Sequence, residues 1–416
     1  MTGLRDGSKS HLETPPPGLV AVRAKRVLDT DRGRWLSDGA VVIRDDRILE
    51  VTPFVPSTAS MIDLGDRSLL PGLIDAHTHI LLQGNHNRQE YAAQILEEDP
   101  AHRVASAVRS LAIALGHGFT ALRDLGTEGA GFADVALRSA VEEGILSGPR
   151  LQVAGPAIAA THSYPISNYR ADWTFPVGVA ECDGVEGCRR EVRRQIARGV
   201  DWIKVYATSG SGMRLGEDGY LDSPPPWTVA ELNTLVEVAH EHGVRVAAHA
   251  MAATGTDMAV EAGVDSIEHG TAIRPATAAT MAERGIVLVP TLLALREPSV
   301  QSLQNCRNAG VTFVFGTDVG AFYWDEFNQC RELELLVDLG LTPLEAIRSA
   351  TVAAAALLGQ SGDLGEIKAG AYADLVACPG DPLNDVAALQ RVDVVLKAGR
   401  VLVSTDQLSR AQAVTT

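Results

Sequence analysis

The sequence lacks the features that mark membrane, secreted and nucleic-acid-binding proteins. It holds no run of about 18 apolar residues, so no segment is expected to span a membrane. Residues 1–18 have no apolar stretch like that of a signal peptide, and they are predicted to form a polar tail. Lys and Arg form no basic block and the formal net charge is -16, so we expect no nucleic-acid partner.

Cysteine patterns are also missing. The five cysteines are scattered, odd in number and never arranged as CxxC. This usage predicts a reduced, cytoplasmic protein without a disulfide framework.

Phosphate-binding loops are absent as well. No GxGxxG or GxxxxGK[ST] pattern follows an apolar run. A doubly wound open sheet that binds nucleotides usually carries such a turn after its first strand. Its absence disfavours that fold.

The two ends of the chain resemble each other and differ from the middle. Val- and Ile-rich runs separated by Gly, Asp and Ser occupy both ends and read as strands. Isolated hairpins are marginal in water, so the ends are expected to share one sheet. We predict a composite β domain from residues 19–70 plus 361–405, in the form of a small β-sandwich.

Short apolar runs alternate with helical patterns through residues 71–360, and several of these patterns end in Gly. Such alternation is typical of a parallel sheet with crossover helices, and eight units favour a (β/α)8 TIM barrel. The expected strands lie at 70–80, 119–126, 150–159, 201–210, 244–250, 265–270, 286–292 and 311–318.

Potential metal ligands fall at the ends of several of these runs. Two histidines in DAHTHI are spaced i and i+2, so both should face the barrel axis at its C-terminal mouth, where barrel active sites form. Imidazole with carboxylate is the ligand set of Zn²⁺ and also suits Fe, Mn or Ni. The candidates are His77, His79, His249, His269 and Asp318, with Lys204 in the fourth run.

Lys204 has two interpretations. It can be a salt-bridged lysine with its stem buried. Alternatively, CO₂ can convert its amine into an anionic carbamate that bridges two metals, and desolvation favours the neutral amine this requires.

Several motifs resemble the amidohydrolase superfamily over residues 19–405. LLPGLIDAHTH resembles its opening metal motif, and GDLGEIKAGAYADLVAC resembles its C-terminal sheet signature. GFTALRDLGT and VDSIEHGTAI are similar to the imidazolonepropionase-like branch, which includes Xaa-Pro dipeptidases and ochratoxinase-like hydrolases. WIKVYATSG resembles members with a carboxylated lysine.

The resemblance implies a binuclear site, most simply with two Zn²⁺ ions. His77, His79 and Asp318 would bind the more buried ion, and His249 and His269 the more exposed one. Lys204 would bridge both as its carbamate. A metal-bridged hydroxide would attack the substrate carbonyl, and Asp318 would carry the proton to the leaving group.

The implied enzyme is a metal-dependent hydrolase of an amide bond in a dipeptide or an N-acyl amino acid. An ester, lactone, carbamate or organophosphate stays open as the alternative substrate. A deaminase or cyclic amidase, and a structural protein without catalysis, are further alternatives. Fold topology alone cannot separate these activities.

Three further residues are candidates for substrate contact. His162 could donate to the substrate carbonyl, and Tyr206 shares the inward face of Lys204. Arg170 could pair with an acidic substrate, although surface placement is the commoner outcome. The long segments 158–186 and 208–228 are expected to act as lids. A small-molecule substrate and a homo-oligomer are the expected partners.

Overall fold

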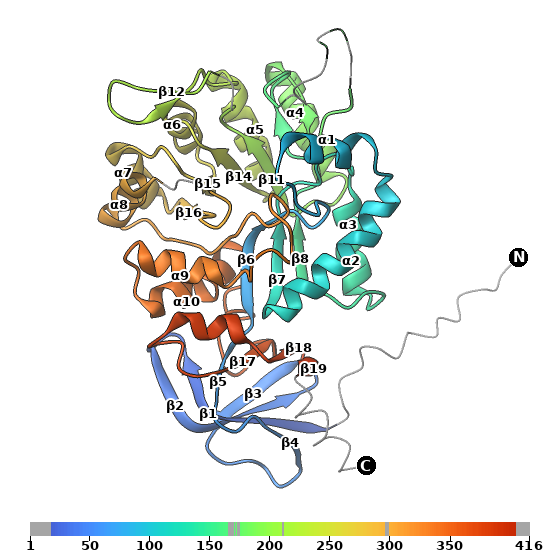
Figure 1. Ribbon diagram of the computed structural model, residues 1–416, viewed down its shortest axis with the longest axis vertical. Coiled ribbons are helices and arrows are strands. Elements are labelled where there is room, and N and C mark those ends of the chain that lie inside the picture. Colours follow the sequence, from blue (N-terminus) through green and yellow to red (C-terminus); the bar gives the residue numbers. More distant parts are fainter. Residues whose placement is uncertain are drawn as a thin grey trace, which may run out of the picture.

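The computed structural model has an α/β fold with two regions, one above the other in Figure 1. It describes residues 18–164, 170, 172, 175–209, 212–295 and 299–404. Most of the predicted tail therefore lies outside the described residues. Among the described helices, none combines the length and apolar character needed to cross a bilayer.

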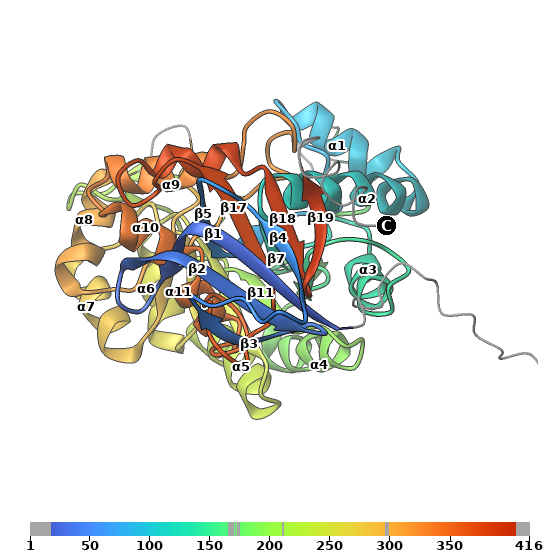
Figure 2. The same ribbon diagram turned by 90° about the horizontal axis from the view of Figure 1, so that it is seen from below.

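Both ends of the chain contribute to one eight-stranded sheet, which lies below the rest of the molecule (Figures 1 and 2). Its order is β19-β18-β17-β5-β1-β2-β3, and β4 pairs with β1. Its strands are β1 (Leu19–Asp29), β2 (Arg34–Arg44), β3 (Arg47–Thr52), β4 (Ala59–Asp63), β5 (Arg67–Pro71), β17 (Leu375–Pro379), β18 (Val394–Lys397) and β19 (Arg400–Ser404).

The sheet buries one face around its own core. Alternate residues of β1, such as Val20 and Val22, share this core with Leu375 of β17 and Leu396 of β18. Period-two alternation of apolar residues places these side chains on a common face. The ends of the chain are thereby held together. The finer description as a β-sandwich stays a prediction.

The middle of the chain forms parallel strands, most of them followed by helices on the outside (Figure 1). One sheet has the order β6-β7-β8 and another the order β10-β9-β11-β14-β15-β16. The strands are β6 (Leu73–Thr78), β7 (Phe119–Asp124), β8 (Arg150–Val153), β9 (Ile158–Ala159), β10 (Ala180–Glu181), β11 (Trp202–Tyr206), β14 (Arg245–Ala250), β15 (Ser266–His269) and β16 (Val287–Val289).

Helices pack against these strands through their apolar faces. Helix α5 begins with a capping box between Thr228 and Glu231, and α6, α7 and α8 end at glycines in the left-handed conformation. The helices are α1 (Arg88–Leu96), α2 (Pro100–Gly116), α3 (Ala133–Glu142), α4 (Gly184–Ile196), α5 (Val229–Glu241), α6 (Ala253–Ala262), α7 (Pro275–Arg284), α8 (Val300–Ala309), α9 (Arg331–Asp338), α10 (Pro343–Ser349) and α11 (Val352–Leu357), with a 3-10 turn at Val386–Arg391.

The expected strand at 311–318 makes isolated bridges instead of a continuous ladder. Phe313 bridges to Leu288 in β16, and Val319 bridges to Thr78 at the end of β6. The Asp318 backbone amide also donates to the His77 carbonyl at 2.8 Å. A left-handed φ of 60° at Asp318 interrupts the extended conformation that a longer strand requires.

The α/β class is therefore confirmed. The described strands form two parallel sheets that the 313–319 segment links, so a closed eight-stranded barrel stays a prediction. The 208–228 segment holds a short hairpin, β12 (Arg214–Leu215) and β13 (Leu221–Asp222). Arg274, just before α7, pairs with Asp218 at 2.6 Å and Asp257 at 2.5 Å, and so ties this hairpin down.

Candidate metal centre

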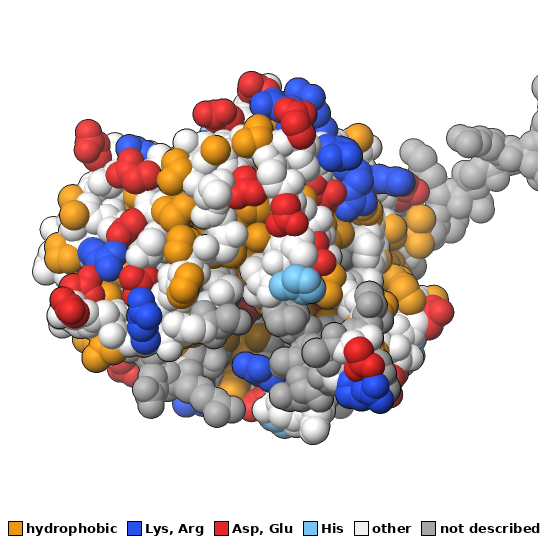
Figure 3. Space-filling model, turned by 90° about the horizontal axis from the view of Figure 1, so that it is seen from above, with side chains coloured by type: hydrophobic (Ala, Val, Ile, Leu, Met, Phe, Trp, Pro, Cys, Tyr) orange, Lys and Arg blue, Asp and Glu red, His pale blue; other side chains and the backbone are white. Residues whose placement is uncertain are grey.

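The carboxyl ends of the parallel strands enclose a cavity of about 300 Å³. Figure 3 views this end of the molecule, and the surface there is hollowed near its centre. All six predicted metal ligands line the cavity: His77, His79, Lys204, His249, His269 and Asp318. Residues spread over 242 positions of sequence thus meet at one place.

Asp318 lies between the two histidines of the first motif. One oxygen of its carboxylate is 3.4 Å from His77 Nε2 and 3.2 Å from His79 Nε2. The possible ligand atoms of His77, His269 and Asp318 all lie within 4.8 Å of one another. This spacing and donor chemistry suit a divalent cation.

Hydrogen bonds at Nδ1 orient the imidazoles of His77 and His79 and leave Nε2 of each ring as the atom that can bind a metal ion. His77 Nδ1 is 2.7 Å from a Glu268 oxygen, and His79 Nδ1 is 2.9 Å from the Gly126 carbonyl oxygen. Carboxylates and carbonyls accept only, so Nδ1 of each ring carries a proton, and Nε2 is the ring atom left to bind a cation. Outer partners of this kind are what hold histidine ligands in metal sites.

The backbone is strained at two of the candidate ligands. His269 has a φ of 70° and Asp318 a φ of 60°, a region that side chains other than Gly rarely adopt. His269 Nδ1 is anchored 2.7 Å from Thr291 Oγ1, and its ring centroid lies 4.7 Å from that of His249. Strain retained at a site is a mark of function.

Lys204 lies beside His77 among the candidate ligands. Its side chain is buried, and Nζ is 3.5 Å from His77 Nε2. Burial lowers the pKa of Lys204 to about 8, despite the opposing charges of Glu268 and Asp318. A substantial fraction of the amine is therefore neutral near physiological pH, which is the form that reacts with CO₂.

Burial and charge also set the state of the imidazoles. Burial and the neighbouring Lys204 hold the pKa of His77 well below its ordinary value. For His79, burial lowers the pKa, but the hydrogen bond and charge of Asp318 outweigh it and raise the value to about 9. A cation bound at this site would therefore displace a proton from His79.

Glu268 and Arg123 form a fully buried ion pair behind His77 that the sequence did not reveal. Arg123 Nη2 donates to Glu268 at 2.9 Å, and Ser266 Oγ donates to the same oxygen at 2.5 Å. Ser266 and Glu268 share a face of β15 as i and i+2 residues. The signal in the sequence was a charged residue inside each of two predicted strands, Arg123 in 119–126 and Glu268 in 265–270.

The three predicted substrate contacts lie in different places. Tyr206 lines the cavity, with its ring centroid 4.8 Å from that of His249. His162 is exposed, and its backbone amide donates to Glu181. Arg170 is exposed and pairs with Asp172 at 2.5 Å. In the predicted lid 158–186, Tyr164 lines the cavity, whereas Tyr169 and Trp173 lie outside the described residues.

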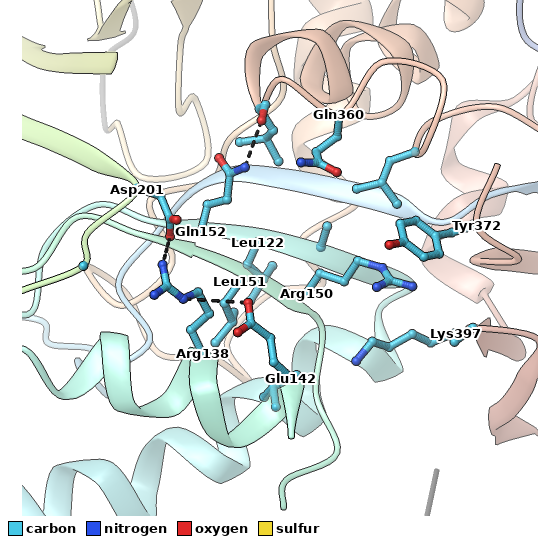
Figure 4. A pocket seen from close by; sticks show the side chains of 16 residues that line it. Leu122, Arg138, Glu142, Arg150, Leu151, Gln152, Asp201, Gln360, Tyr372 and Lys397 are labelled. Atoms are coloured by element: carbon cyan, nitrogen blue, oxygen red, sulfur yellow. Dashed lines mark hydrogen bonds and ion pairs between the residues drawn. The ribbon is translucent and has the colours of Figure 1, made fainter. Parts of the chain in front are cut away.

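A larger cavity of about 510 Å³ lies between β7, β8, α3 and the composite sheet (Figure 4). Arg138 in this cavity contacts Asp201 at 2.5 Å and Glu142 at 3.8 Å, as Figure 4 shows. Arg150 contacts Asp374, which is not among the lining residues, at 2.8 Å. It does not include any of the candidate ligands. Size alone therefore does not locate the reactive site.

Comparisons with known proteins place this geometry in context. A model described as the amidohydrolase family matches residues 68–402. The chain is 30% identical to ochratoxinase of Aspergillus niger over 420 residues, which cover 89% of this chain and 84% of that relative. It is 28% identical to imidazolonepropionase of Deinococcus radiodurans over 400 residues, covering 91% of this chain and 93% of that relative.

Solved structures agree. A prolidase complexed with N-methylphosphonate-L-proline superposes with a TM-score of 0.82 at 31% identity, covering 93% of this chain and 100% of that one. A Xaa-Pro dipeptidase with bound methionine superposes with a TM-score of 0.81 at 29% identity, again covering 93% of this chain and 100% of the other.

Proposed function

Since this chain belongs to the amidohydrolase family and is a hydrolase acting on carbon–nitrogen bonds, we propose that it cleaves the amide bond of a dipeptide or an N-acyl amino acid at a binuclear metal centre. The observation that carries the proposal is the meeting of four histidines, a lysine and an aspartate in one cavity.

The donor set fits two divalent ions, most simply Zn²⁺. His77, His79 and Asp318 would hold one ion, and His249 and His269 the other. The Nδ1 contacts of His77 and His79, which leave Nε2 of each ring for a cation, support this assignment. When bound, such ions supply Lewis acidity toward a carbonyl oxygen.

Lys204 would join the two halves of the site as a carbamate. The neutral Nζ amine would form a bond to the carbon of CO₂ and release one proton, which turns the amine into an anion with two oxygen donors. Its burial and its 3.5 Å distance from His77 Nε2 support this role, because an ammonium group there would repel a metal ion.

Asp318 would serve as the proton carrier of the reaction. Its carboxylate is 15% exposed, so it can face the substrate cavity while His79 holds one of its oxygens. A proton taken up at this carboxylate can pass to the nitrogen of the leaving amine. Tyr206 would contact the substrate from the cavity wall. Contacts from His162 and Arg170 would require the substrate to reach the surface where these residues lie.

Other bonds compete with the amide. An ester, lactone, carbamate or organophosphate would place a similar electrophile in the same cavity. The placement of Lys204 among the candidate ligands supports a two-metal site and so disfavours a deaminase that uses a single metal, whereas a cyclic amidase stays an alternative. A structural protein without catalysis would have no need of strained backbone at His269 and Asp318.

We also infer that the two parallel sheets and the 313–319 segment together complete an eight-unit barrel over residues 71–360. The backbone hydrogen bond from Ala76 to Phe315 and the bridge from Thr78 to Val319 support closure. Residues 19–70 and 361–405 would then act as one domain.

A hydrolysis screen of the Zn-loaded protein tests the proposal. It should include dipeptides, N-acyl amino acids, aryl esters, carbamates and lactones, with metal content measured on the same sample. We expect about two ions per chain and the highest kcat/KM on an amide. One ion or none would reject the binuclear centre, and a preference for an ester or lactone would reject the amide assignment.

A further inference from the structure

One wall of the cavity consists of three tyrosines around a buried carboxylate. Tyr91 comes from α1, Glu128 follows β7, Tyr164 follows β9 and Tyr206 ends β11, and all four line the same cavity as the metal ligands. We call these four residues the tyrosine–carboxylate wall. Glu128 is not one of the candidate metal ligands.

Both oxygens of Glu128 are held by phenols. Tyr91 donates to one oxygen at 2.5 Å, and Tyr206 donates to the other at 3.2 Å. Burial, reinforced by the charge of Glu128, raises the pKa of Tyr91 and Tyr206 above the ordinary value, so both phenols stay protonated and donate. The carboxylate thus faces the cavity in a fixed orientation.

The backbone around Glu128 is built to keep it there. Glu128 has a left-handed φ of 46°, which is unfavourable for a side chain of this size. The buried guanidinium of Arg103 donates to the backbone oxygens of Glu128 at 2.6 Å and Thr127 at 3.0 Å. These contacts stabilise the strained loop, and the loop in turn directs the Glu128 carboxylate into the cavity.

No close ion pair balances the charge of Glu128 in the described part of the chain, although Arg103, His79 and Lys204 act on it through space. Its side chain is 2% exposed, and within the described part of the chain no Lys or Arg nitrogen lies within 4.0 Å of its carboxylate. Arg103 is turned toward backbone oxygens instead. A buried carboxylate is unfavourable unless an opposite charge approaches it. A cationic part of a substrate would supply that charge.

Three tyrosine rings pack side by side along the cavity next to Glu128, so a ligand there would meet their outer surfaces. The ring centroids of Tyr91 and Tyr164 are 6.3 Å apart, and those of Tyr164 and Tyr206 are 4.4 Å apart. Aromatic faces attract ammonium groups through their quadrupoles, and a carboxylate adds a direct electrostatic attraction. A carboxylate of the substrate would be repelled at this wall.

Building on the proposed amide hydrolysis, we propose that the tyrosine–carboxylate wall is an ammonium site that selects substrates with a free or alkylated amino group beside the scissile carbonyl. The preferred substrate is then a dipeptide with a free amino terminus. An N-acyl amino acid, which is neutral at the equivalent position, is the poorer substrate.

A matched pair of substrates tests the selection. The kcat/KM of one dipeptide is compared with that of its N-acetylated form, in the wild-type protein and in Glu128→Gln. We expect the wild type to favour the free amine, and the ratio of the two kcat/KM values to fall at least about tenfold in the variant. Glu142→Gln, which changes a 65% exposed carboxylate near the other cavity, is the control and should keep the ratio.

Two outcomes would overturn the proposal. The first is a wild-type preference for the acetylated substrate. The second is an unchanged ratio in Glu128→Gln accompanied by loss of metal, which would assign the carboxylate to the metal centre.

Binding of tetramethylammonium decides the issue independently of turnover. This probe carries a fixed positive charge and can neither ligate a metal nor donate a hydrogen bond. Calorimetry should show binding to the wild type, at least about tenfold weaker binding to Glu128→Gln, and none for the neutral tert-butanol. If neither dipeptide form is hydrolysed but tetramethylammonium binds in this pattern, the proposed function fails and the ammonium site stands. Equal binding to both proteins refutes the site.

Discussion

The buried pair of Glu268 and Arg123 allows stability and metal affinity to be separated experimentally. Glu268 accepts hydrogen bonds from Arg123 at 2.9 Å and from His77 at 2.7 Å, and it is fully buried. In Glu268→Gln a single amide oxygen replaces two carboxylate oxygens, so it cannot accept from both partners. Arg123 then keeps a buried charge without its counter-ion.

Two effects of known size should follow. Breaking a buried ion pair by removing one partner typically lowers the free energy of unfolding by about 3–5 kcal/mol. Loss of the group that orients a histidine ligand lowers metal affinity by about 10–100-fold. The first effect is expected in urea denaturation of chelator-treated protein, and the second in calorimetric titration with Zn²⁺.

The double variant Arg123→Met/Glu268→Gln distinguishes the two. Methionine removes the charge and keeps an apolar stem over Trp202, whose ring lies 4.4 Å from the guanidinium carbon of Arg123. We expect the double variant to recover much of the lost stability without recovering metal affinity, because the support of His77 is still missing. A double variant as unstable as Glu268→Gln would refute the buried-charge explanation. Unchanged Zn²⁺ affinity in either variant would refute the role of Glu268 in orienting His77.

Three other predictions concern single residues. Lys204→Ala should remove most of the bound metal, measured by elemental analysis, and a small carboxylate such as acetate should restore part of it; full activity in this variant would reject the carbamate. Asp318→Asn should lose far more kcat than metal, and an unchanged kcat would remove its proton-carrying role. Burial raises the pKa of Glu332 to about 8 from an ordinary 4.5. In the folded, chelator-treated protein the Glu332 carboxyl therefore holds a proton that the unfolded chain releases. The contribution of Glu332 to the free energy of unfolding should therefore fall by about 1.4 kcal/mol per pH unit between about pH 5 and 8, and it should stay constant above that range. Urea denaturation of wild type and Glu332→Gln across this range should differ in slope, and parallel curves would contradict the shifted pKa.

The fold could be predicted where the periodicity of apolar residues and the alternation of strands with helices determine it. Alternation of apolar runs with helical patterns predicted the α/β class, and the parallel strands β6, β7, β11, β14 and β15 lie inside the predicted runs. The last run, 311–318, makes only isolated bridges to its two neighbouring strands in place of a regular ladder, which no periodicity reveals. The predicted relationship to amidohydrolases and the predicted hydrolase activity are confirmed.

The site residues that stand at the ends of parallel strands could be predicted from the sequence. His77 and His79 signal themselves by spacing, and the C-terminal mouth of the parallel strands brings distant residues together. Glu128 and Glu268 could not be found in this way. Glu128 reaches the cavity through a strained loop, and Glu268 contacts a residue 191 positions away, so both depend on tertiary contacts.

The composite sheet has a consequence for how the chain folds during synthesis. Leu375 of β17 pairs with Pro71 at the end of β5, so the edge of β5 stays open until about 300 further residues have been made. At about 5–20 residues per second, that interval is about 15–60 s. An unpaired strand edge can pair with other chains during such a delay. The long-range pairing that unites the ends therefore makes early chains dependent on protection by chaperones or on rapid completion of the parallel region.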